Sequence, residues 1–259
     1  MKLNAKIALF GALCLSLSAC VSNTSTERSS GDIPNKMGAA ERAQVHTERA
    51  AEYFRMGKLG VSLEAVQQAL AALPEHSPAH NMRGLIYMEL QENIKAKDSF
   101  EAALKYAPTD SDVLNNFGWF VCQRGDVTKS IDYFRQALKN PLYSTPERAL
   151  LNGGICARKL GDLAAAESNL LAALERNPQL AQAQLQMADL EFNKGKMSAA
   201  ADRMSRYLNL DSSPAVDSLL LAVKIARGQG DRNQEASYVQ QMRKRFPESE
   251  LTRTVLQNR

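Results

Sequence analysis

Three glycines recur at nearly equal intervals along the chain, and each one begins the same local pattern. Gly84, Gly118 and Gly154 are separated by thirty-four and thirty-six residues. A small residue follows each glycine after twelve positions and an alanine after nineteen, which gives the pairs Ala96 and Ala103, Ser130 and Ala137, and Ala166 and Ala173. Small residues at fixed places let two helices approach closely. The spacing therefore predicts a two-helix unit that repeats about every 34 residues.

This period is typical of the tetratricopeptide repeat (TPR), whose units cannot bury their apolar faces alone and therefore stack. The predicted fold is all-α, a solenoid of about six TPRs within residues 41–259, with a concave side that holds a partner protein. Glycine after the first helix and proline after the second mark most units. The expected repeats span residues 43–76, 77–110, 111–144, 147–180, 181–214 and 215–247. Residues after Ser249 either extend the last helix or are loose.

The N-terminal residues 1–19 are predicted to be a lipoprotein signal peptide. Lys2 and Lys6 precede an apolar segment at 7–17, which is too short to span a bilayer as a permanent helix. Small residues then lead to Cys20 in the sequence Leu-Ser-Ala-Cys, which resembles a bacterial lipobox. We expect Cys20 to carry the lipid. The alternative is an ordinary secretory signal cut nearby, with Cys20 as a free thiol.

The residues after Cys20 suggest where the protein resides. Residue 21 is Val rather than the Asp that retains lipoproteins in the inner membrane of enteric-type bacteria. We therefore expect a lipid-anchored protein on the periplasmic face of the outer membrane. Residues 20–40 are polar and rich in Ser and Thr, so burial could not offset the entropy of ordering them. They are predicted to form a flexible tether behind the lipid.

Charge and motif content argue against several functions. The formal net charge of +4 is too slight to indicate nucleic-acid binding, and Lys/Arg residues are not interleaved densely with aromatics. The three histidines have no partners at ligand spacing, and neither a phosphate loop nor a G-x-S-x-G motif is present. We therefore expect no catalysis, no metal, no cofactor and no small-molecule substrate.

Two cysteines remain for the folded body once Cys14 leaves with the signal peptide and Cys20 is lipidated. Cys122 and Cys156 fall on the first helices of adjacent repeats, at similar heights. An even pair in an oxidising compartment predicts a disulfide between them, worth about 3 kcal/mol in the chain-entropy view. Two buried free thiols are the alternative. A redox-active pair is disfavoured because there is no C-x-x-C motif.

The first helices of the early repeats carry the candidate partner groove. Places 2, 5, 9 and 12 of these helices line the inner side of a TPR solenoid. Phe54, Leu85, Met88 and Trp119 would form an apolar strip there, accompanied by Asn115. Aromatic and methionine side chains are effective anchors for a partner segment. The alternative is that these residues pack between neighbouring repeats and expose little.

Residues 115–122 (NNFGWFVC), 141–146 (PLYSTP), 152–156 (NGGIC) and 236–249 resemble the type IV pilus biogenesis and stability lipoproteins, the PilW/PilF family. This resemblance implies a right-handed superhelix of six repeats. It also implies a pilotin, which is an outer-membrane lipoprotein that helps pilus secretin subunits reach the outer membrane and multimerise. In some relatives the emphasis is on pilus stability. The alternative function is a periplasmic TPR scaffold for outer-membrane protein assembly or cell-wall synthesis.

Overall fold

The computed structural model describes residues 37–257 of the 259-residue chain. The predicted signal peptide, Cys20 and most of the predicted tether lie outside the described residues. The compact folded unit begins at Gly38. Within 37–257, none of the helices has the length and apolar character needed to cross a membrane.

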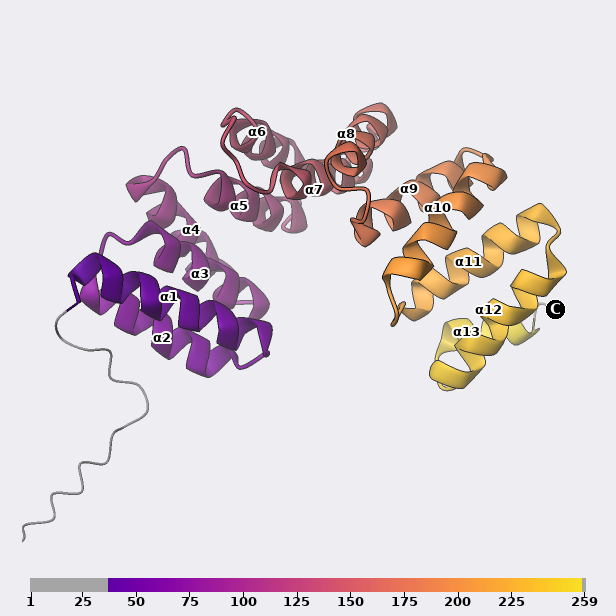
Figure 1. Cartoon of the computed structure of the whole chain (residues 1–259), viewed down its shortest axis with the longest axis horizontal. Coiled ribbons are helices and arrows are strands. Elements are labelled where there is room, and N and C mark those ends of the chain that lie inside the picture. The colour runs from indigo at the N-terminus through magenta and orange to yellow at the C-terminus, as the bar shows by residue number, and fades with distance from the viewer. Residues whose placement is uncertain (1–36, 258–259) are drawn as a thin grey trace, which may run out of the picture. The chain divides into compact units, whose positions relative to one another are not determined.

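The described residues form thirteen helices and no strand, which confirms the predicted all-α fold (Figure 1). Contacts are densest within consecutive pairs, α1 with α2 through α11 with α12, so the six pairs are six TPRs. The helices are α1 (Ala39–Arg55), α2 (Leu59–Ala72), α3 (Ser77–Glu89), α4 (Asn93–Tyr106), α5 (Ser111–Gln123), α6 (Val127–Ala137), α7 (Pro146–Lys159), α8 (Leu163–Arg176), α9 (Ala181–Asn193), α10 (Met197–Leu210), α11 (Val216–Gln229), α12 (Arg232–Arg245) and α13 (Glu250–Gln257).

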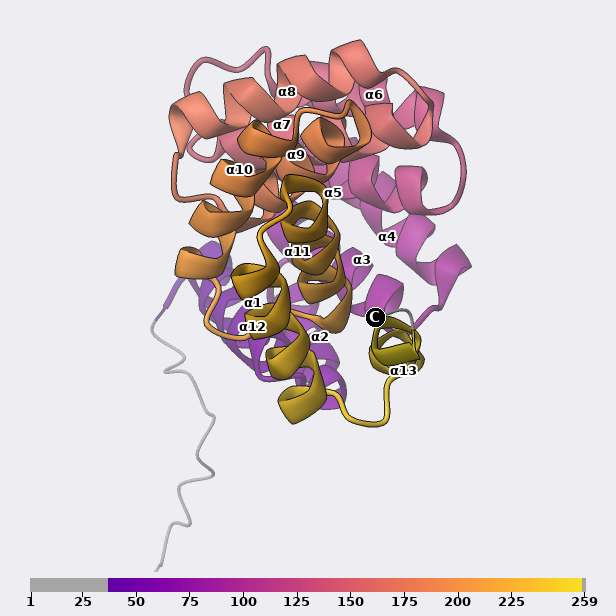
Figure 2. The same ribbon diagram turned by 90° about the vertical axis from the view of Figure 1, so that its right-hand side faces the viewer.

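Both ends of the repeat array differ in detail from the sequence expectation. Residues 39 and 40, which the sequence interpretation placed in the tether, are the first residues of α1. Of the residues expected either to extend the last helix or to be loose, the described ones, 250–257, do neither. They form the separate helix α13, which a loop joins to the end of α12 (Figure 2). It packs on α11 and α12 and buries Thr252 and Val255. This helix covers the apolar surface that the last repeat would otherwise expose, as expected for a solenoid cap.

The turn inside each repeat explains why the pairs form where they do. In five of the six turns, a glycine at positive φ ends the first helix, as at Gly161 with φ 84°. Glycine adopts this conformation without the steric cost of a Cβ atom. In the second repeat Gln91 takes that place, with φ 60°. The following Asp caps the second helix in several repeats, as when Asp162 accepts a hydrogen bond of 2.9 Å from the Ala165 N–H.

The opening glycines of the pattern lie where the two helices of a repeat come closest. A Cβ atom at Gly84 would lie 2.7 Å from the Phe100 ring, and one at Gly154 would lie 2.9 Å from Leu170. At Gly118 a Cβ atom would likewise lie too close to the Phe134 ring. The periodic glycine is therefore required by close packing, as the spacing predicts.

The helices form two layers. Each first helix contacts the first helix of the next repeat, from α1 and α3 through α9 and α11, and α11 contacts α13. Each second helix packs on the next first helix, as α2 does on α3, but α2 and α4 do not contact each other in the described structure. The first-helix layer is therefore the closely spaced inner side of the stack. We call it the first-helix wall.

Candidate protein-binding surface

The four predicted apolar groove residues lie on the first-helix wall and share one environment. Phe54, Leu85, Met88 and Trp119 are each half-buried and pack against the cores of their own and neighbouring repeats. Each side chain thus fills part of a repeat junction and keeps part of its surface exposed. Their use as partner contacts stays a prediction, but the geometry leaves this apolar surface accessible.

Trp119 on α5 has the most distinctive surroundings of the four. Its ring packs against the buried cluster that includes Cys122 and Cys156. The Lys159 ammonium nitrogen on α7 lies 5.9 Å from the centroid of the indole ring. That nitrogen also donates a 2.8 Å hydrogen bond to Gln123 Oε1 on α5. Trp119 therefore presents an indole ring bordered by a cation that is itself held in position.

Asn115 behaves differently from the apolar residues, because it is only 5% exposed. It belongs to a chain of amide hydrogen bonds across α3, α5 and α7, which we call the asparagine chain. Asn116 Nδ2 donates to Asn81 Oδ1 over 3.2 Å, and Asn115 Nδ2 donates to Asn116 Oδ1 over 3.2 Å. Asn152 Nδ2 donates to Asn115 Oδ1 over 3.0 Å. The sequence indicated the individual asparagines but not the chain they form.

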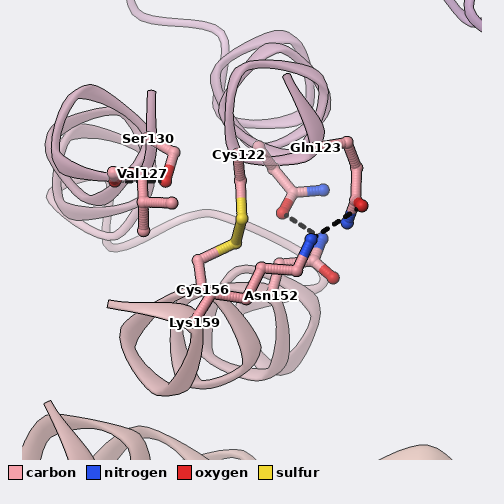
Figure 3. Close-up of a disulfide and its surroundings, with 8 residues drawn as sticks. Cys122, Gln123, Val127, Ser130, Asn152, Cys156 and Lys159 are labelled. Atoms are coloured by element: carbon pink, nitrogen blue, oxygen red, sulfur yellow. Dashed lines mark hydrogen bonds between the residues drawn. A yellow bond between two sulfur atoms is a disulfide. The ribbon is translucent and has the colours of Figure 1, made fainter. Parts of the chain in front are cut away.

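The structure contains the predicted disulfide between Cys122 and Cys156. Their Cα atoms are 6.1 Å apart, and the bond joins α5 of the third repeat to α7 of the fourth (Figure 3). Both cysteines are almost completely buried. The hydrogen bonds of Asn152 and Lys159 to α5 lie beside it in the same view. The junction of these two first helices is therefore tied by one covalent bond and two polar contacts.

A hollow on the first-helix wall lies between α9 and α11 and has a volume of about 320 Å³. Apolar and charged side chains share its lining: Leu185, Asp189, Phe192, Asp217, Leu221 and Lys224. The Arg158 guanidinium on α7 pairs with the Asp189 carboxylate at 2.5 Å. The sequence interpretation did not extend the groove to this region. Leu185 and Phe192 occupy places 5 and 12 of the fifth repeat, so counting the same places there would have found them.

Titratable groups with shifted pKa values occur in several repeats, and two of them, Asp112 on α5 and Tyr143, influence each other. Burial raises the pKa of Tyr143, on the α6–α7 connection, to about 12. Burial also raises the pKa of Glu191 on α9, against the opposing effect of the Arg203 guanidinium. Among residues 37–257, no group of three or more His, Cys, Asp or Glu side chains could hold a metal ion.

Comparison with known proteins places this architecture in a family. The tetratricopeptide repeat family matches residues 77–110 and 151–216. The crystal structure of PilW, a widely conserved type IV pilus biogenesis factor, is similar with a TM-score of 0.75 and 34% identity. The match covers 83% of this chain and 98% of the PilW chain.

A further relative, PilF, is more distant in sequence and was matched both as a sequence and as a solved structure. The type IV pilus assembly protein PilF of Pseudomonas aeruginosa is 23% identical over 244 residues, covering 94% of this chain and 95% of PilF. The solved Pseudomonas aeruginosa PilF structure matches with a TM-score of 0.78 and 22% identity, covering 86% of this chain and all of that one. At this identity the structural likeness shows the fold alone.

The resemblance found in the sequence motifs is confirmed by the comparison with PilW. The identity of 34% extends over almost the whole solved PilW chain rather than over isolated repeats. This chain therefore belongs to the PilW/PilF family of type IV pilus assembly proteins, whose members are TPR scaffolds and generally non-catalytic.

Proposed function

We propose that this protein is a pilotin, anchored by a lipid on Cys20 to the periplasmic face of the outer membrane. It binds pilus secretin subunits and promotes their localisation and multimerisation there, or stabilises assembled pili. The observation that supports this proposal most is the 34% identity to PilW over 98% of that pilus biogenesis factor. The lipid brings the wall to the outer membrane, and the wall holds the secretin subunit.

The first-helix wall over α1, α3 and α5 is the proposed contact surface. Phe54, Leu85, Met88 and Trp119 remain partly accessible there, although each is supported by the core behind it. Anchors that are already held in place lose little side-chain entropy on binding. Asn115 is buried, so we assign it the role of holding the wall from within rather than contacting the partner.

The decisive test is deletion of the gene, followed by detection of heat-resistant secretin multimers in envelope fractions and by counting of pili. We expect both to be lost and to return with the wild-type gene. A Cys20→Ala gene should restore neither at the outer membrane, because the anchor is missing. Normal multimers and normal piliation in the deletion strain would refute the proposal.

The contact surface is tested with Trp119→Ala, compared with Leu171→Ala on the second helix α8, where the leucine is exposed away from the wall. Trp119→Ala should weaken co-purification of secretin with only a modest fall in melting temperature, while Leu171→Ala should change neither. A large fall in melting temperature with secretin binding intact would show that Trp119 serves the core instead.

A further inference from the structure

We propose that a furrow on the second-helix side of the last two repeats binds a neutral glycan strand that carries acetamido groups. The furrow lies between α10 and α12, and we call it the α10–α12 furrow. It is separate from the first-helix wall, so the protein can hold a glycan and a protein partner at the same time. The inference therefore goes beyond the proposed function and does not depend on which protein the wall binds.

The furrow exists because α10 and α12 both pack on α11 but do not contact each other in the described structure. Its narrow middle part is lined by residues of all three helices, including Ala222 and Ile225 of α11 and Tyr238 of α12. Beyond this middle part it widens into hollows of about 280 and 450 Å³. Ser205 borders both hollows, so they form one continuous depression.

Amide and hydroxyl groups dominate the lining of the two hollows. They belong to Ser205, Asn209, Gln229, Gln234, Tyr238 and Gln241. A side-chain amide both donates and accepts hydrogen bonds, and so does a hydroxyl group. The hydroxyl and acetamido groups of a sugar have the same two capacities. The lining therefore matches a polyhydroxylated ligand better than an apolar protein segment, which would need large apolar anchor sites.

Two of these amides keep their hydrogen-bonding capacity free. The side chains of Asn209 on α10 and Gln241 on α12 have no hydrogen-bond partner within residues 37–257. Asn209 is exposed and Gln241 is half-buried, and both line the hollow of about 280 Å³. Displacing water from such groups is compensated only by a ligand that forms hydrogen bonds in return. Amides on the two sides of one hollow can thus bind the same ligand.

Two charged groups of this hollow are already held in position. The Asp211 carboxylate accepts hydrogen bonds of 2.7 Å from the Tyr207 hydroxyl and 2.9 Å from the Ser213 N–H. The Arg245 guanidinium donates to Ser213 Oγ over 3.1 Å. A fixed carboxylate can accept hydrogen bonds from sugar hydroxyls, and a fixed guanidinium can donate to them. Groups oriented before binding avoid the entropy cost of ordering them at that moment.

The same hollow offers the apolar contacts that a sugar ring and an acetamido methyl group require. Tyr238 is half-buried, and its hydroxyl donates a 3.0 Å hydrogen bond to Gln234 Oε1, which fixes the direction of the ring. An aromatic face can cover the C–H groups of a sugar ring. Leu208 and Pro214 also line this hollow and can contact the methyl group.

The charge of the furrow disfavours a strongly anionic glycan. Three carboxylates line the two hollows, those of Asp202, Asp211 and Asp231, whereas Arg245 is the lining cation. A phosphorylated or sulfated chain would be repelled by this excess of negative charge. A neutral chain meets no such penalty. The furrow therefore selects for hydrogen-bonding groups without charge.

The length of the furrow suits a chain of sugars. It extends along α10 from Ala201 to Asn209, which is about 12 Å at the rise of an α-helix. A short run of linked sugar rings fits this length. The proposed periplasmic location places the furrow beside the cell wall, whose glycan is a chain of N-acetylated sugars. A soluble N-acetylated oligosaccharide has the same chemistry, so the experiment separates the two sources.

The first test measures co-sedimentation of the full-length protein, in detergent, with purified protein-free cell-wall sacculi. We expect the wild type to bind and Gln241→Ala to weaken binding about tenfold, equal to roughly 1.4 kcal/mol. Asn209→Ala should act similarly, and its exposed position means that the fold does not depend on it. The control Gln136→Ala removes an exposed amide of α6, outside the furrow, and should change nothing.

The second test titrates the same proteins calorimetrically with a soluble oligomer of N-acetylglucosamine at low and at high salt. A neutral ligand should bind equally well at both, whereas adsorption of this basic protein to an anionic surface would be screened by salt. Affinity that falls steeply with salt, binding that is insensitive to both Gln241→Ala and Asn209→Ala, or no binding to either probe would each overturn the inference. Binding of the oligomer without binding of sacculi would support the ligand chemistry and identify a soluble glycan as its source.

The two proposals can fail separately. If neither glycan probe binds but deletion of the gene abolishes secretin multimers, the pilotin proposal stands and the inference is wrong. If the glycan probes bind through Asn209 and Gln241 but secretin multimers are normal in the deletion strain, the inference stands and the pilotin proposal is wrong.

Discussion

The junction of the third and fourth repeats and the junction of the fifth and sixth are built from equivalent helices, but they are held together differently. At the first, α5 and α7 are joined by the Cys122–Cys156 disulfide and by hydrogen bonds from Asn152 and Lys159. At the second, α9 and α11 border a hollow of about 320 Å³. There a polar link to α11 comes from the second helix α10, where the Tyr207 hydroxyl donates to Ser218 Oγ over 3.2 Å.

This difference shows that a regular repeat period does not give every junction the same stability. The stability of a repeat stack is approximately a sum of unit and neighbour contributions, so each junction can open by itself. Local opening begins where burial and bonding are weakest. We therefore expect the α9–α11 junction to open before the α5–α7 junction, and four substitution experiments can challenge this comparison.

The largest effect is expected from removing a side chain that spans the cross-linked junction. Phe134 is 3% exposed, and its ring contacts the positions of both Gly118 on α5 and Gly153 on α7. Phe134→Ala should lower the free energy of unfolding by about 3–5 kcal/mol. Phe192→Ala beside the α9–α11 hollow should cost no more than about 2 kcal/mol, because that ring is only partly buried. Equal losses in urea unfolding would contradict the comparison.

Loss of the disulfide should come next. The double substitution Cys122→Ala with Cys156→Ala opens a loop closed over 34 residues. The free energy of unfolding should fall by about 3 kcal/mol. Addition of a reductant to the unfolding experiment should destabilise the wild type by a similar amount and leave the double variant unchanged. A wild type indifferent to reductant would show that the bond contributes little to this junction.

Filling the hollow should produce a smaller change of opposite sign. Leu221→Phe places extra apolar volume beside the space between α9 and α11, and should raise the free energy of unfolding by about 1 kcal/mol. The matched change Leu114→Phe on α5 enters the filled core beside the disulfide of the α5–α7 junction and should lower it by about 1–3 kcal/mol. Thermal melting of the two variants should therefore move in opposite directions. Movement in the same direction would mean that the two junctions are packed alike.

The smallest effect concerns a buried carboxylate in the fifth repeat. Glu191 is 7% exposed and lies 3.6 Å from Arg203, with Oε2 lacking a hydrogen-bond partner. Burial raises the pKa of this carboxyl above 4.5, so the folded state binds the proton more tightly than the unfolded chain does. The ionised form therefore costs stability at neutral pH, and this cost disappears as the pH falls below 4.5.

Glu191→Gln should accordingly raise the melting temperature slightly at pH 7, and the gain should vanish near pH 4. Glu175→Gln, at an exposed position on α8, serves as the control and should change little at either pH. A lower melting temperature for Glu191→Gln at pH 7 would show that the pairing with Arg203 outweighs the cost of burial.

Much of the architecture could be predicted from residues whose backbone conformation or size decides the local structure around them. Glycine ends the first helix at Gly161 because it accepts positive φ, and Gly84 recurs as a close-packing residue because a Cβ atom would overlap Phe100. Cys122 and Cys156 lie at similar heights on the parallel first helices of the third and fourth repeats, and this was enough to predict their disulfide bond. The end of the array was less predictable, because the separate helix α13 depends on the apolar surface that it covers.

The sequence by itself determined the period, the helix pairs, the cysteine pairing and the family, because each depends on residue type at a fixed spacing. Only the tertiary structure decided that Asn81, Asn116, Asn115 and Asn152 form one hydrogen-bonded chain and that Asn115 is buried within it. It also decided that α9 and α11 leave a hollow. The physical reason is the positional precision that these features require. They depend on how side chains from three helices fill the space between them, to within about 1 Å. A repeat period alone does not fix distances that finely.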